Sequence, residues 1–150
     1  KNVHSTGKKT LIFGNGGSAA LASHFSVDLT KNAGLRCVNF NEADLITCFA
    51  NDYGFERWVE KAVEFYGDEG DLLIVISSSG SSKNMLNSVK AARNGKFKAV
   101  ITFSGFEKNI SALSSYLKGE AEPKFDKVIS KNFATTIASV KIFTSLKNIS

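Results

Sequence analysis

The sequence predicts an α/β protein built on a doubly wound parallel sheet. Three observations lead to this fold class: apolar and amphipathic segments alternate, glycine or serine turns separate them, and one segment, DLLIVIS at 71–77, is apolar on both faces. Such a strand is typical of the centre of a parallel sheet with helices on both sides. Because 150 residues suffice for one core, we expect residues 1–150 to form a single domain.

The expected elements follow one another along the chain as strand, turn and helix. Strands are expected at 9–13, 35–40, 71–77, 97–103 and, at a sheet edge, 127–130. Helices are expected at 18–31, 55–66, 83–93, 110–117 and 132–146. Ser18 is placed to cap the first of these helices. Ligands of such sheets bind beyond the carboxyl ends of the strands, so the loops after 9–13 and 71–77 are the candidate binding loops.

Composition and charge exclude several classes of function. No apolar run reaches the ~18 residues of a membrane span, and the first residues lack the apolar core of a signal peptide, so we expect a cytoplasmic protein without a membrane partner. The net charge is +5, but the lysines are scattered and do not line one helix. We therefore expect no nucleic-acid partner, while the charge equally suits an anionic small substrate. Cys37 and Cys48 form no metal-spaced cluster and are interpreted as packing residues rather than redox or metal residues.

The first candidate loop is GNGGS at 14–18, between an expected strand and an expected helix. Backbone N–H groups and the positive end of a helix dipole can bind an anion at such a turn. The spacing matches neither G-x-G-x-x-G nor a Walker loop. Phosphate binding and a plain strand–helix turn therefore both remain open for this loop.

The second candidate loop is SSSGSS at 77–82, in which five serines surround Gly80. Hydroxyls and backbone amides together can coordinate the three oxygens of a phosphate. A flexible polar linker is the alternative. Because the loop is short and lies between strong elements, we favour phosphate binding.

Three segments carry a family resemblance: GNGGSAALASHFSVDLT, ANDYGFE and GDLLIVISSSGSSKNML. In this order and at these intervals they resemble the SIS (sugar isomerase) domain family, above all the bacterial phosphoheptose isomerases. The resemblance implies a three-layer α/β/α, flavodoxin-like fold, a homotetramer with sites at subunit interfaces, and isomerisation of sedoheptulose 7-phosphate or a similar sugar phosphate through an enediol. It also implies that the chain lacks the family's N-terminal helical region.

The same resemblance implies roles for individual residues. The residues that match the family's substrate-binding positions are Ser77, Ser78, Ser79 and Ser82 for the phosphate, Asn15, Gly16, Gly17 and Ser18 for the sugar, and Asn51 and Asp52 for the open chain. Asp28 stands where the family has its general-base glutamate, and His24 lies one helical turn before it. These two are the implied catalytic residues, on one helix face.

Two departures from the family pattern leave turnover open. The carboxylate of Asp28 reaches about one methylene less far than that of glutamate, and ~1 Å of displacement can cost two orders of magnitude in rate. The segment 130–150 holds no histidine, glutamine or glutamate, whereas the family has an R-x-Q-E-x-x-H type segment there. The alternative is a non-catalytic SIS domain that binds a sugar phosphate, or a protein partner such as a replication initiator.

The His24–Asp28 pair also raises the question of a metal. By family resemblance the pair could hold zinc, but two ligands fall short of the three or four that a stable zinc site takes. We prefer His24 as a polar residue that faces the ligand cleft, and no cofactor is required from the sequence.

Overall fold

The computed structural model describes residues 2–105 and 128–130, which form a parallel sheet with helices on both faces. The strands are β1 (Thr10–Gly14), β2 (Cys37–Asn39), β3 (Leu72–Ser77), β4 (Ala99–Ser104) and β5 (Val128–Ser130). Their order in the sheet is β2-β1-β3-β4-β5, and every neighbouring pair is parallel. The predicted doubly wound sheet is confirmed, with β3 at its centre.

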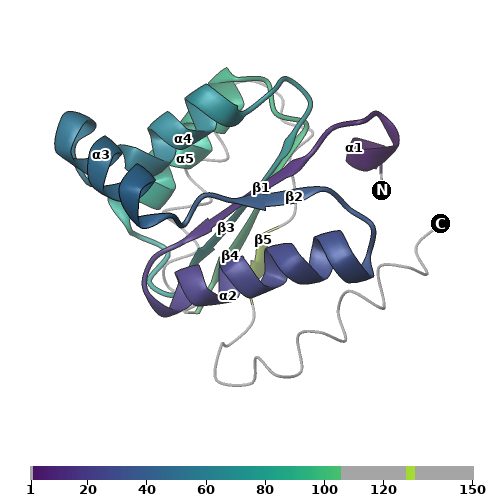
Figure 1. Cartoon of the computed structure of the whole chain (residues 1–150), viewed down its shortest axis with the longest axis horizontal. Coiled ribbons are helices and arrows are strands. Elements are labelled where there is room, and N and C mark those ends of the chain that lie inside the picture. Colours follow the sequence, from purple (N-terminus) through teal and green to yellow (C-terminus); the bar gives the residue numbers. More distant parts are fainter. Residues whose placement is uncertain (1, 106–127, 131–150) are drawn as a thin grey trace.

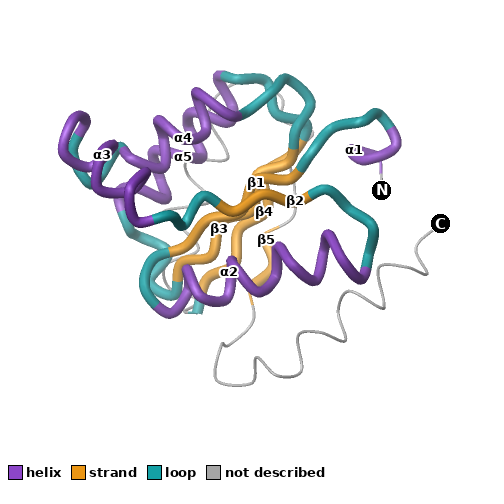
Figure 2. Tube along the Cα trace, viewed as in Figure 1, coloured by secondary structure: helices purple, strands orange, loops and turns teal. Residues whose placement is uncertain are grey.

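Helices lie on both faces of this sheet, which gives the three predicted layers. The helical segments are α1 (Asn2–Ser5), α2 (Gly17–Val27), η1 (Asp28–Asn32), α3 (Ala43–Tyr53), α4 (Trp58–Tyr66) and α5 (Lys83–Asn94). Helix α2 covers one face, and α3, α4 and α5 lie on the other (Figure 1, Figure 2). Among the helices of the described residues, none has the length and apolar character needed to cross a membrane.

The core consists of two apolar layers, one on each face of the sheet. Alternate strand residues point to opposite faces. Leu11, Phe13 and Val75 therefore pack with residues of α4 and α5, whereas Ile12 and Ile74 pack on the side of α2. Both faces of the central strands are buried, which explains why their sequences are apolar without alternation.

Several boundaries differ from the sequence prediction. Helix α2 begins at Gly17, with Gly16 as its N-cap and no capping bond from Ser18, so the predicted cap is wrong. The expected helix 18–31 is divided, since its last part is a π-helix that starts at Asp28. Helix α4 begins at Trp58 rather than Phe55, which is exposed.

One helix was not expected at all. Helix α3 spans 43–53, and its partly buried Leu45, Ile46 and Phe49 pack against the core on the α4 side. The short edge strand expected at 127–130 is present as β5. The helices expected at 110–117 and 132–146 lie outside the described residues.

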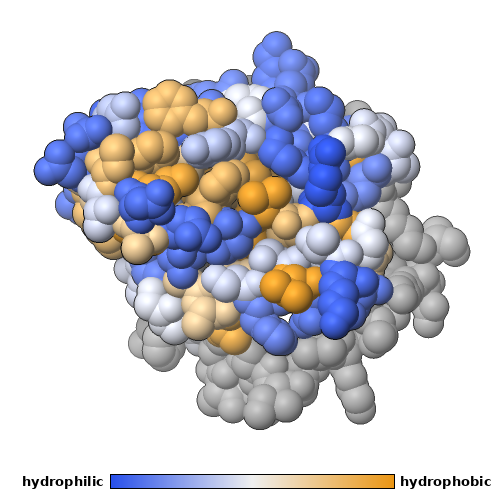
Figure 3. Space-filling view, in the orientation of Figure 1, coloured by the Kyte–Doolittle hydropathy of each residue, from blue (hydrophilic) through white to orange (hydrophobic). Residues whose placement is uncertain are grey.

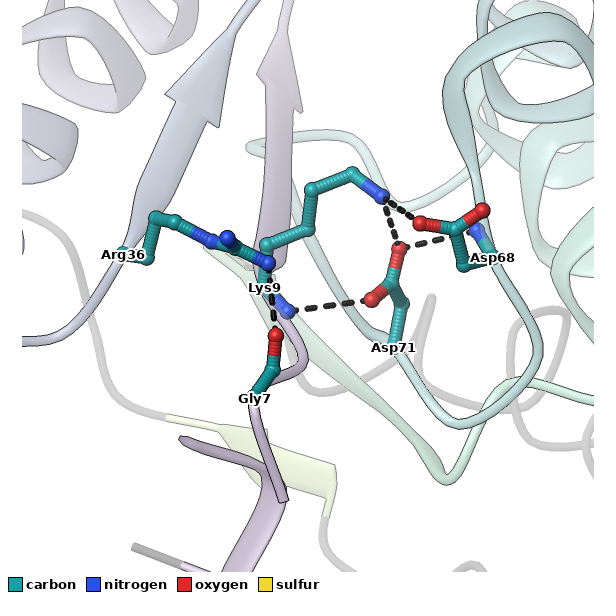
Figure 4. Close-up of polar contacts among 5 residues, drawn as sticks. All are labelled: Gly7, Lys9, Arg36, Asp68 and Asp71. Atoms are coloured by element: carbon teal, nitrogen blue, oxygen red, sulfur yellow. Dashed lines mark hydrogen bonds and ion pairs between the residues drawn. The ribbon is translucent and has the colours of Figure 1, made fainter. Parts of the chain in front are cut away.

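A partly buried ion pair joins the amino ends of the two central strands (Figure 4). The side chain of Asp71, with 0% exposure, precedes β3 and accepts from the Lys9 backbone N–H at 3.0 Å and from Lys9 Nζ at 2.6 Å. Lys9 Nζ also reaches Asp68 at 2.7 Å, and the Asp68 N–H donates to Asp71 at 2.9 Å. This cluster lies at the edge of the sheet opposite to the candidate loops and fixes β1 beside β3.

Candidate functional site

The two candidate loops lie at the point where the sheet changes direction. Strands β1 and β3 are neighbours, but β1 leads into α2 on one face and β3 leads into α5 on the other (Figure 1). A crevice opens at the carboxyl ends of such a strand pair, and it is the usual ligand site of open α/β sheets. The loops GNGGS and SSSGSS therefore flank the position at which this fold binds ligands.

The first loop is a tight turn that only glycine permits at two positions. A Cβ atom at Gly14 would collide with the backbone of Ser18, because the first turn of α2 packs directly over it. Gly16 has φ of 51°, a conformation that side chains disfavour. The backbone carbonyl of Asn15 accepts from the Ser18 N–H at 2.9 Å. This hydrogen bond lies within the loop, and Gly16 and Gly17 are exposed, so their backbone faces solvent.

The second loop gathers three serine hydroxyls at the N-terminus of α5. The hydroxyl of Ser82 lies 3.5 Å from those of both Ser77 and Ser79. Ser77 is 5% exposed and its hydroxyl accepts from the Gly80 N–H at 3.2 Å. Ser78 is exposed, and its carbonyl accepts from the Gly105 N–H at 3.0 Å. Hydroxyls beside a helix N-terminus provide donors and a positive partial charge for an anion.

A pair of side-chain amides joins the two loops. Asn15 Nδ2 donates to Asn84 Oδ1 at 3.0 Å, and Asn84 Nδ2 donates to Asn15 Oδ1 at 2.8 Å. Asn84 lies in the first turn of α5 and is 3% exposed. The structure thus joins the first loop, GNGGS, and the second loop, SSSGSS (the serine loop), through a contact that the sequence did not predict.

Of the implied catalytic pair, His24 lies in the last turn of α2 and Asp28 is the first residue of η1. His24 Nε2 is 3.6 Å from Asp28 Oδ2, and the two side chains are 81% and 36% exposed. Asp28 Oδ1 accepts from Asn32 Nδ2 at 2.9 Å. Helix rise places His24 about 10 Å and Asp28 about 16 Å from the start of α2 along its axis. The pair therefore lies apart from the two loops, on the exposed side of the helix.

The backbone at Asp28 is unusual. The Ala33 N–H donates to the Asp28 carbonyl at 3.2 Å, which is the bond of a π-helix. Such widened turns are rare and are frequent at functional sites. The irregular turn thus coincides with the residue that matches the family's general base.

Asn51 and Asp52 lie on α3, and their side chains are exposed. Asn51 Nδ2 donates to Asp52 Oδ1 at 2.9 Å, and the Cys48 thiol lies 3.7 Å from Asp52 Oδ2. Within the described ranges these bonds all stay on α3 and reach neither loop. The structure therefore leaves this pair free to contact a ligand or a neighbouring molecule.

Comparison with known proteins identifies the family. The family model of the SIS domain matches residues 1–105. The chain belongs to the SIS domain family. The phosphoheptose isomerase of Fusobacterium nucleatum is 44% identical over 97 residues, and that of Helicobacter pylori 41% over 98; each alignment covers 61% of this chain. These alignments cover 50% and 51% of the two relatives, so the chain spans about half the length of the curated relatives it matches.

Solved structures show the same SIS fold. A phosphoheptose isomerase from Neisseria gonorrhoeae is 37% identical, with a TM-score of 0.67 over 73% of this chain and 60% of that one. A second, from Francisella tularensis, is 30% identical, with a TM-score of 0.70 over 86% of this chain and 64% of that one. The family resemblance and the fold predicted from sequence are both confirmed.

Asn84 is the residue of this SIS domain that the sequence analysis missed. It closes the segment SSSGSSKN, so it stood inside one of the recognised motifs. A buried asparagine two residues after a helix N-cap is a signal, because an amide is seldom buried without a specific partner. Its partner Asn15 is 69 residues away in the chain, so no local sequence pattern could predict the pair.

The family resemblance raised zinc, and the described residues can be tested for it. They contain no group of three or more histidine, cysteine, aspartate or glutamate side chains placed to hold a metal ion. His24 and Asp28 supply two ligands, and a zinc site takes three or four. This part of the SIS domain therefore does not fit a complete zinc site, and no step is derived through a metal.

Proposed function

We propose that this SIS domain is the sugar-phosphate site of a phosphoheptose isomerase, which interconverts sedoheptulose 7-phosphate and the corresponding aldose. One observation carries the proposal: the hydroxyls of Ser77, Ser79 and Ser82 gather at the N-terminus of α5, at the switch point of the sheet. That arrangement suits a phosphate. The similar proteins described above are phosphoheptose isomerases by name, which supports the choice of sugar.

In the proposed reaction a carboxylate moves a proton between two adjacent carbons. Asp28 takes a proton from C1 of the ketose while O2 gains a proton from solvent, which gives the enediol. Asp28 then returns its proton to C2 while O1 loses its proton to solvent, which gives the aldose. The oxidation level of the sugar as a whole is unchanged, so the reaction needs no redox cofactor. The phosphate and the reacting carbons stand at opposite ends of the sugar.

Binding of sedoheptulose 7-phosphate by titration calorimetry tests the site. Ser79→Ala removes a hydroxyl from the gathered cluster and is expected to weaken binding about tenfold, as the loss of a hydrogen bond to a charged group does. Ser81→Ala is the matched control, because this exposed serine of the same loop is not among the expected ligands. Equal affinity of both variants and the natural chain contradicts the phosphate site.

We also propose that the domain acts as a homotetramer. Apolar side chains gather over α3 and α4 (Figure 3), where Phe65 is 59%, Tyr66 44% and Tyr53 38% exposed. Phe49 and Phe65 form an edge-to-face pair with centroids 5.6 Å apart within this surface. Exposed aromatic surfaces of this kind are typical of protein interfaces. The exposed Asn51–Asp52 pair on α3 is then available to a neighbouring subunit.

Light scattering of the purified chain measures the assembly. Four chains of 16.2 kDa are expected, and Phe65→Glu should lower the mass, because it places a charge in the aromatic surface. Glu69→Lys, an exposed change in the loop after α4, should leave the mass unchanged. A single-chain mass for the natural protein contradicts the tetramer.

A cytoplasmic location is part of the proposal. Cys37 and Cys48 are free thiols in the structure, which is usual in reducing compartments. The non-catalytic alternative is favoured by two observations: the aspartate at the position of the family's glutamate, and the lack of histidine, glutamine and glutamate in the segment 130–150. It differs from the isomerase in a single outcome, which is binding of the sugar phosphate without proton exchange.

A further inference from the structure

The amide pair between Asn15 and Asn84 has a fixed orientation. Asn84 Oδ1 accepts from the backbone N–H of Met85 at 3.1 Å. A backbone N–H can only donate, so the atom of Asn84 that faces it must be the oxygen. Asn84 Nδ2 then faces Asn15 Oδ1, at 2.8 Å, and Asn15 Nδ2 faces Asn84 Oδ1. The first turn of α5 thereby fixes the positions of the oxygen and the nitrogen of the Asn15 side-chain amide.

We propose that Asn84 is a positioning residue, which holds Asn15 in one orientation and sets the first loop, GNGGS, against the serine loop. This inference rests on the proposed function. Neither the family match nor the resemblance of the motifs assigns a role to Asn84. Its burial at 3% exposure and its three hydrogen bonds show that it faces the protein and not the ligand.

The orientation has a consequence for what Asn15 binds. One Nδ2 proton and one Oδ1 lone pair of Asn15 are used by Asn84. Among the described residues the other proton and the other lone pair have no partner, so Asn15 offers one donor and one acceptor, on opposite flanks of its amide. A sugar hydroxyl both donates and accepts, whereas a phosphate oxygen only accepts. Asn15 therefore suits a hydroxyl of the sugar, and the phosphate belongs to the serines.

Two probes separate these functions: sedoheptulose 7-phosphate, which uses both loops, and inorganic phosphate, which uses the serine loop alone. Asn84→Ala is expected to raise the dissociation constant of the sugar phosphate about tenfold, as loss of one to two hydrogen bonds does. It should change that of inorganic phosphate less than about twofold. Asn84→Asp keeps the acceptor for the Met85 N–H but loses the donor to Asn15 Oδ1, and should weaken sugar binding while α5 keeps its start.

Ser88→Ala controls for plain loss of structure. Ser88 is fully buried in the same helix, and its hydroxyl donates to the Met85 carbonyl at 2.7 Å. Among the described residues it forms no hydrogen bond with the first loop. It should lower stability without changing the affinity for either probe. The double variant Asn15→Ala/Asn84→Ala should bind the sugar phosphate no more weakly than Asn15→Ala, because Asn84 acts through Asn15. If the two substitutions instead weaken sugar-phosphate binding by the product of their separate effects, the proposal is overturned.

Side-chain amide signals in a ¹⁵N spectrum decide the placement independently of any ligand. Asn84→Ala should shift the Asn15 side-chain signal and the backbone signals of Gly16 and Gly17, and Ser88→Ala should not. If Asn84→Ala leaves these signals unchanged, or binds the sugar phosphate like the natural chain, the proposal is overturned. If the natural chain binds neither probe, the proposed function fails, and the spectrum alone then decides whether Asn84 places the loop.

Discussion

Lys9 and Asp71 form a partly buried ion pair, with Nζ 2.6 Å from Oδ2, directly before the two central strands. The Asp71 carboxylate has 0% exposure and is also held by the backbone N–H groups of Lys9 and Asp68. A buried carboxylate that loses its cation is left with an uncompensated charge, which is expensive. The pair therefore joins β1 to β3 at the end of the sheet opposite to the two candidate loops.

Lys9→Met should destabilise the domain by about 3 kcal/mol, the lower part of the range for breaking a buried pair. Denaturant unfolding followed by circular dichroism measures this loss. Asp68→Asn, which removes the exposed partner of the same lysine, should cost less. Equal losses in the two variants contradict the assignment of the stabilising role to Asp71.

The same pair makes a prediction about alkaline pH. Burial opposes the charge of Lys9, but hydrogen bonds to Asp68 and Asp71 outweigh it and raise the pKa of Lys9 above its usual 10.5. A raised folded-state pKa gives stability that is complete below the unfolded value and is lost as pH rises through the folded one. Unfolding titrations above pH 10.5 should show a steeper loss for the natural chain than for Lys9→Met. If the stability of the two proteins falls equally steeply with pH, the raised pKa of Lys9 is contradicted.

Gly14→Ala should destabilise the domain by about 1–3 kcal/mol, because the added Cβ collides with the backbone of Ser18. Gly17→Ala is the matched control from the same loop, since a Cβ there meets no atom within 4 Å. Thermal unfolding should separate the two variants. The control should still weaken sugar binding, because its methyl group occupies the open side of the loop.

Fold and site were predictable to different extents, for physical reasons. The central strand β3 is apolar throughout, so its place in the sheet followed from composition alone. Helix α3 was missed although Leu45, Phe49 and Tyr53 recur every four residues, because it has no fully buried residue and no capping side chain to mark its start. The π-turn at Asp28 and the Asn15–Asn84 pair depend on tertiary contacts, and no local pattern encodes them.

The two thiols should differ in reactivity. Burial raises the pKa of Cys37 to about 12, so its thiolate is scarce at neutral pH. Cys48 is exposed, although partial desolvation and the Asp52 and Asp44 carboxylates raise its pKa. Iodoacetamide at pH 8 should modify Cys48 first, as peptide mass spectrometry can show. Asp52→Asn should accelerate the modification of Cys48, because the loss of a neighbouring negative charge lowers the pKa of this thiol. Faster modification of Cys37 than of Cys48 contradicts the predicted order of reactivity.

Asp28→Glu should raise the isomerase rate at least about tenfold, if the shorter carboxylate is what limits the reaction. The longer side chain restores the reach of the family's glutamate at the same helical position. A coupled assay of aldose formation measures kcat. Asn32→Ala removes the hydrogen bond to Asp28 Oδ1 but leaves the Asp28 side chain the same length, so it should change kcat less. A lower kcat for Asp28→Glu contradicts the account of the base.

The most direct test of the proposed isomerase activity is exchange of solvent deuterium into the sugar. Sedoheptulose 7-phosphate is incubated with the natural chain in D₂O, and proton spectra follow the signals of C1 and C2. An enediol mechanism predicts deuterium at these carbons with the natural chain and none with Asp28→Asn, although that variant still binds the sugar. Binding without any uptake by the natural chain would contradict the proposed catalysis.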